Sequence, residues 1–95
     1  MAEKHPILVV DDEIYNLDAI KRTFRDAYQI FSTSDPREAI RIISNEKLHL
    51  ILSDQRMPEM SGIELLKIAL EKQPEAIRII LTAYTDVEDM IDAIN

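Results

Sequence analysis

The sequence predicts an α/β domain with a doubly wound parallel sheet. Two observations lead to this fold class. Short apolar runs rich in β-branched residues alternate with segments whose apolar residues recur every three or four positions. Buried parallel strands joined by right-handed helical crossovers produce this alternation. We therefore expect four strands and four helices in one domain over residues 1–95.

The first strand and the first helix are predicted from neighbouring patterns. Residues 7–10 are wholly apolar and typical of a strand buried on both faces. Ile14, Leu17, Ile20 and Phe24 then recur at helical spacing. The acidic residues between the two segments lie where the positive end of a helix dipole favours negative charge.

The second strand and the second helix follow in the same order. Residues 28–32 predict the strand. Asp35 is a typical helix N-cap, and Pro36 suits the first helical position. Ala39 and Ile43 contribute to an apolar helix face.

The third strand is predicted over residues 48–53, with Pro58 in the loop that follows. Ser61 and Glu64 have the spacing of a capping box, which predicts a third helix. This helix must end before Pro74.

The fourth strand is predicted over residues 77–81 and is followed by Thr82. Thr85 and Glu88 form a second possible capping box. The apolar spacing from Val87 onward predicts a fourth helix that continues to residue 95.

Composition limits the functions that fit. Eighteen acidic and 11 basic residues give a formal net charge of -7, so binding to nucleic acid or to an anionic membrane has little electrostatic support. The chain has no cysteine, which excludes disulfides and thiolate zinc sites. The N-terminal residues lack the apolar stretch of a signal peptide, and we expect a cytoplasmic protein.

Polar residues directly follow three of the predicted strands. Asp11 and Asp12 follow the first, Asp54 the third and Thr82 the fourth. Each alone also fits a plainer role in a helix start or a loop, but neighbouring parallel strands would bring them to one rim. Three carboxylates there repel each other and favour a cation, and Mg²⁺ prefers such oxygen ligands. Calcium fits less well because no looped Asp-x-Asp-x-Asp-Gly pattern is present.

The chain resembles the receiver domains of two-component response regulators, which have a flavodoxin-like fold. The resemblance covers the whole chain. Three segments carry it: Val-Val-Asp-Asp-Glu at 9–13, Ser-Asp-Gln-Arg-Met-Pro-Glu-Met-Ser-Gly at 53–62, and Ile-Leu-Thr-Ala-Tyr-Thr-Asp at 80–86.

The resemblance implies a role for each matching residue. Asp54 would accept a phosphoryl group from a sensor histidine kinase or a phosphotransfer protein. Asp12 would bind Mg²⁺ directly, Asp11 through water, and Arg56 through its backbone carbonyl. Thr82 would be the switch hydroxyl, while Arg56 and Tyr84 would tune the lifetime of the acyl phosphate. The domain would be regulatory and not an enzyme.

The sequence departs from the family after the fourth predicted helix. The family's lysine has no counterpart, because no lysine occurs after Thr82. The family's fifth strand and fifth helix have no counterpart either. The lysines are Lys4, Lys21, Lys47, Lys67 and Lys72. We therefore expect a C-terminally incomplete receiver that self-associates through the uncovered fourth strand or fourth helix. A piece of a longer protein, a natural truncation and a chain completed by a partner all fit the sequence.

Rival functions lack the residues that they need. A flavin binder would need a phosphate loop rich in glycine and hydroxyl groups after the first strand, and a P-loop enzyme would need its glycines and lysine. A haloacid-dehalogenase-like phosphatase would need an acid where this chain has Arg56. The remaining alternative is a receiver fragment without phosphotransfer that acts as a dimerisation or protein-interaction module.

Overall fold

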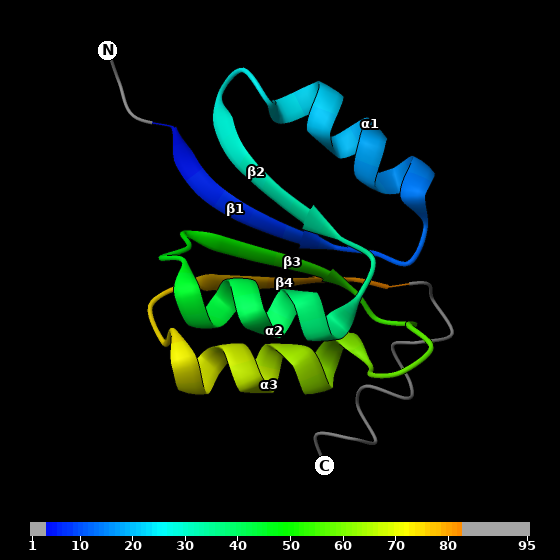
Figure 1. Ribbon diagram of the computed structural model, residues 1–95, viewed down its shortest axis with the longest axis vertical. Helices are drawn as coiled ribbons and strands as arrows, with labels where there is room; N and C mark the ends of the chain where they lie inside the picture. Colours follow the sequence, from blue (N-terminus) through cyan, green and yellow to red (C-terminus); the bar gives the residue numbers. More distant parts are fainter. Residues whose placement is uncertain (1–3, 83–95) are drawn as a thin grey trace.

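The computed structural model describes residues 4–82, and over this range the predicted order of elements is confirmed (Figure 1). The elements are β1 (His5–Val10), α1 (Ile14–Phe24), β2 (Tyr28–Thr33), α2 (Pro36–Asn45), β3 (Leu50–Asp54), α3 (Gly62–Lys72) and β4 (Ile77–Leu81). The fourth predicted helix lies outside the described residues. Within residues 4–82, no helix has the length and hydropathy needed to cross a membrane.

The strands form one sheet in the order β2-β1-β3-β4, and each neighbouring pair is parallel. Figure 1 shows α1 on one face of this sheet and α2 and α3 on the other. The predicted doubly wound, flavodoxin-like sheet is therefore confirmed, with three of the four predicted helices inside the described range. The order also places β3 between β1 and β4, so the three strands that end in acidic or hydroxyl residues are neighbours.

Two strands begin at residues other than those predicted, and β2 and β3 each extend one residue beyond the predicted end. The first strand begins at His5 and not at residue 7, because β1 already pairs with β2 where His5 lies beside Tyr28. The third strand begins at Leu50 and not at Leu48. Leu48 is buried, but its N–H donates to Oε1 of Gln73 at 2.8 Å and not to a neighbouring strand. Apolar character alone therefore extended the predicted third strand too far.

The main core lies between the sheet and the pair α2 and α3. It joins nine buried residues: Leu8, Val10, Ala39, Ile43, Leu48, Ile51, Leu65, Ala69 and Ala76. The opposite face is only partly covered by α1. There Ile77 and Ile79 on β4 remain 62% and 41% exposed, and an apolar groove of about 420 Å³ runs across the sheet.

Two helices begin at the predicted caps. The Asp35 side chain accepts a hydrogen bond from the Arg37 N–H at 2.9 Å. The Ser61 hydroxyl accepts from the Glu64 N–H at 3.2 Å and donates to the Glu64 carboxylate at 3.1 Å, completing a capping box. The start of α3 is thereby fixed close to the end of β3.

Replacing Ile51 by Ala should test where the core lies. Ile51 is fully buried between β3 and the helices, so the truncation should lower the free energy of unfolding by about 2 to 5 kcal/mol. Ile79→Ala is the matched control on the open face and should cost only about 1 kcal/mol. Urea denaturation measures both, and equal losses would contradict this account of the packing.

Candidate functional site

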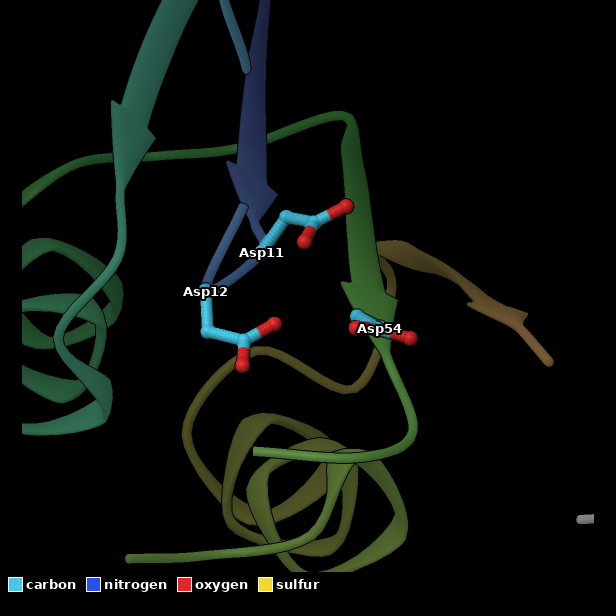
Figure 2. Close-up of side chains that lie close together, drawn as sticks. All are labelled: Asp11, Asp12 and Asp54. Carbon is cyan, nitrogen blue, oxygen red and sulfur yellow. The ribbon is translucent and has the colours of Figure 1, made fainter. Parts of the chain in front are cut away.

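Three carboxylates converge at the carboxyl end of the sheet (Figure 2). Val10 lies beside Ser53 in the parallel pair of β1 and β3, so the next residues, Asp11 and Asp54, reach the same rim. Asp12 follows directly. One oxygen from each of the three carboxylates lies within 4.8 Å of the others, which confirms the convergence predicted from the sequence.

The three carboxylates differ in their exposure to solvent. Asp11 is only 3% exposed, Asp54 is partly buried and Asp12 is exposed. The cluster therefore has a buried inner side at Asp11 and an open side at Asp12. A small ion or a phosphoryl group can reach Asp54 from this open side.

The Asp11 carboxylate is held by the start of α1. Its Oδ1 accepts a hydrogen bond from the Glu13 N–H at 2.8 Å, and its Oδ2 accepts from the Asn16 side-chain amide at 3.0 Å. Sequence reasoning missed Asn16. Its position in the first turn of a helix that begins directly after the acids was the available signal.

Within the cluster, the environment of Asp54 shifts the pKa of its carboxyl upward. Burial raises the pKa of its carboxyl above the ordinary value of 3.8, and the charges of Asp11 and Asp12 raise it further. Hydrogen bonds from the backbone of Gln55 and Arg56 act in the opposite direction on this pKa but do not reverse the shift. Burial and the neighbouring charges both disfavour the ionised carboxyl, so the site favours either a proton or a cation.

Gln55 fixes the chain after Asp54 to two other elements. Its backbone N–H donates to the Leu81 carbonyl at the end of β4 at 3.1 Å. Its backbone carbonyl accepts from the Gly62 N–H at 3.0 Å, and its side-chain Oε1 accepts from the Ile63 N–H at 3.0 Å. Sequence reasoning also missed this residue, because the bonds depend on the tertiary position of α3.

Gly62 is required at the start of α3 by its close contact with β3. A Cβ atom there would lie 2.4 Å from the Asp54 carbonyl oxygen, which is too short for any side chain. The helix therefore packs directly against the backbone of Asp54. The backbone of the residue that carries the carboxylate is thus held in place by contact with α3.

Two further predicted site residues, Thr82 and Arg56, lie just beyond the ends of β4 and β3. Leu81 pairs with Asp54 in the sheet, so Thr82 comes next at the same end, where it is exposed. Arg56 is exposed two residues beyond Asp54. Tyr84 falls outside the described residues.

The donor set of the cluster fits a magnesium ion. Mg²⁺ prefers oxygen ligands and is usually held by one or two carboxylates together with water and phosphate oxygens. Asp11, Asp12 and Asp54 supply such oxygens within reach of one another. A divalent cation would also relieve the repulsion that raises the Asp54 pKa.

Comparison with known proteins gives a consistent family match. The family model described as "Response regulator receiver domain" matches residues 7–95. The hydrogenase transcriptional regulatory protein HoxA of Cupriavidus necator is 40% identical over 89 residues, which is 94% of this chain and 18% of that protein. The chain spans about a fifth of the length of the first two curated relatives that it matches.

Solved structures agree with the family match. A CheY-like response regulator receiver domain from Methanospirillum hungatei superposes with a TM-score of 0.87 at 31% identity, covering 98% of this chain and 75% of that one. A response regulator from Burkholderia pseudomallei has a TM-score of 0.78 at 27% identity, covering 85% of this chain and 48% of that one. That structure contains a phosphorylated aspartic acid, a calcium ion and citrate.

Asp54→Asn should stabilise the metal-free protein at pH 7. Folding raises the Asp54 pKa, so it is the ionised form that destabilises the fold, and this penalty is fully present above the raised pKa. Because solvent screens the partly exposed carboxyl, we expect a rise in Tm of only about 2 to 4 °C. Thermal unfolding followed by circular dichroism in a chelating buffer measures it.

The pH dependence and a control variant make this test specific. The gain should shrink as the pH falls through the raised pKa and vanish below the ordinary value of 3.8, where the carboxyl of the wild type is protonated in both the folded and the unfolded state. Asp26→Asn makes the same charge change at an exposed turn residue. An equal rise in Tm for both variants would show that net charge, and not the cluster, is responsible.

Proposed function

Because this chain belongs to the response regulator receiver domain family, we propose that Asp54 accepts a phosphoryl group from a histidine kinase or a phosphotransfer protein. One observation carries the proposal. Asp54 is the last residue of β3, and its carboxylate lies beside two further carboxylates in a position that solvent can reach. The phosphorylated aspartic acid of the Burkholderia pseudomallei regulator supports the same chemistry on a similar fold.

The proposed reaction makes Asp54 a covalent nucleophile. One carboxylate oxygen attacks the phosphorus of a phosphohistidine as the phosphorus–nitrogen bond breaks, and the imidazole leaves with the electron pair. The product is an acyl phosphate. The raised pKa of Asp54 supports this role, since a more basic carboxylate oxygen is a better nucleophile.

Asp11, Asp12 and Asp54, with the backbone carbonyl of Arg56, are the proposed magnesium ligands. When bound, Mg²⁺ would neutralise charge on the phosphoryl oxygens during transfer. The carboxylates of Asp11 and Asp12 would hold the ion beside Asp54 and set the side from which the donor approaches. Asp54 itself would then be relieved of the repulsion that opposes its ionised form.

The proposed signal leaves the site through β4. A phosphoryl group adds negative charge and acceptor oxygens, which can reorder a nearby loop through new hydrogen bonds. The Gln55 N–H donates to the Leu81 carbonyl, next to Thr82, and we propose that this bond carries a change at the acyl phosphate toward Thr82. We propose Thr82 as the switch hydroxyl and Arg56 and Tyr84 as residues that tune hydrolysis.

The output is proposed from the relatives alone. HoxA of Cupriavidus necator and ZraR of Escherichia coli are named as transcriptional regulatory proteins, and this chain corresponds to a fifth or less of each. We propose that the chain is the phosphorylation-controlled part of a longer regulator of this kind. Its formal net charge of -7 makes direct contact with DNA by this domain unfavourable.

Phosphorylation should require both Asp54 and magnesium. Incubation with acetyl phosphate should add one phosphoryl mass to the wild type and to the control Asp26→Asn when Mg²⁺ is present. Asp54→Asn should gain no adduct, and a chelator should prevent the adduct in the wild type. Intact-mass spectrometry measures each case, and an unmodified but folded wild type would overturn the proposal.

A second candidate function is self-association through β4. Within residues 4–82, β4 lies at one edge of the sheet, and Ile77, Ile79 and Leu81 present exposed apolar side chains on the sheet face beside that edge. An edge strand with exposed apolar residues can pair with the same strand of a second copy. This candidate would give the chain a role as an interaction module even without phosphotransfer.

Ile79→Lys should abolish such association by placing a charge at the centre of the exposed strand. The weight-average mass of the wild type in sedimentation equilibrium should then rise across a concentration series, while the variant stays monomeric. Leu70→Lys introduces the same charge at a similarly exposed residue of α3 and should behave as the wild type. A wild type that remains monomeric at every concentration would refute this candidate.

A further inference from the structure

Asp11 is the buried member of the acidic cluster, and both of its oxygens are occupied by α1 and the residue before it. Oδ1 accepts from the Glu13 backbone and Oδ2 from the Asn16 amide, while only 3% of the residue is exposed. Glu13 is the N-cap of α1, and Asn16 is the third residue of the helix. The carboxylate is therefore clamped to the start of one helix by two donors.

We propose that Asn16 is a positioning residue for the metal site: its amide sets the orientation in which Asp11 faces the ion. The inference rests on the proposed function, since it concerns the magnesium ion that phosphotransfer would use. Asn16 does not contact the phosphoryl group in this account and acts only through Asp11.

A neutral donor suits this position better than a charged one. An ammonium or guanidinium group beside Asp11 would cancel part of the negative charge that attracts Mg²⁺. The Asn16 amide fixes the carboxylate with one hydrogen bond of 3.0 Å and leaves its full charge for the ion. Groups that orient metal-binding carboxylates typically change metal affinity by about 10- to 100-fold when removed.

Loss of the amide would free one oxygen of Asp11. The remaining bond from the Glu13 N–H holds only Oδ1, so the carboxylate could rotate about that contact. The ion would then have to restrict this motion when it binds, which weakens binding without altering Asp54. Affinity for Mg²⁺ should therefore change, while the maximal rate of phosphorylation at saturating Mg²⁺ should not.

Asn16→Leu and Asn16→Gln of the full 95-residue chain test the inference. Leucine is close to asparagine in size and has a higher helix propensity, so weaker metal binding cannot be attributed to a poorer α1. Glutamine keeps a side-chain amide donor. Asn45→Leu is the matched control, because the Asn45 amide donates to a carbonyl of its own helix at 2.8 Å and, among the described residues, lies outside the acidic cluster.

Isothermal titration with MgCl₂ should give a Kd about tenfold higher for Asn16→Leu than for the wild type. Asn16→Gln should fall between them, and Asn45→Leu should equal the wild type. The Mg²⁺ concentration for half-maximal phosphorylation by acetyl phosphate should rise in parallel, at an unchanged maximal rate.

The possible failures are distinguishable. Unchanged Mg²⁺ affinity in Asn16→Leu, or equal weakening in the leucine and glutamine variants, would overturn the inference and leave the proposed function standing. A wild type that binds no Mg²⁺ and forms no adduct would overturn the proposed function and the inference with it.

Discussion

Asp11, Asp12 and Asp54 are held close together although their charges repel, and the rest of the site follows from this constraint. Two unit charges about 4 Å apart interact by roughly 4 kcal/mol at an effective dielectric of about 20. Because Asp12 is exposed and Asp54 is partly exposed, solvent screens this repulsion, and its cost to folding is only a fraction of that figure. The fold must still oppose the repulsion, and the ionised cluster is left with a preference for a cation.

The packed face of the sheet supplies this opposition. Leu8, Val10 and Ile51 anchor β1 and β3 in the core formed with α2 and α3, so the strand ends cannot move apart. Gly62 lets α3 press against the backbone of Asp54, and Gln55 joins that backbone to the end of β4. A change of charge at the carboxylate thus acts on a backbone that is tied to both α3 and β4.

Much of this arrangement could be predicted because it follows from local patterns. Apolar runs located the strands, Asp35 and Ser61 marked helix starts, and acids at strand ends located the site. The roles of Asn16 and Gln55 could not be predicted, since each depends on where a helix lies relative to a strand end.

Leu48 illustrates the same limit on the strand boundaries. It is as apolar as a strand residue, yet a hydrogen bond from its N–H to Gln73, 25 positions later, keeps it out of the sheet. Anomalous scattering from a crystal of this chain soaked in Mn²⁺, a close substitute for Mg²⁺, would show directly whether the clustered carboxylates bind a divalent cation. We expect one strong peak among the Asp11, Asp12 and Asp54 carboxylates. A clear peak elsewhere with none at the cluster would contradict this expectation.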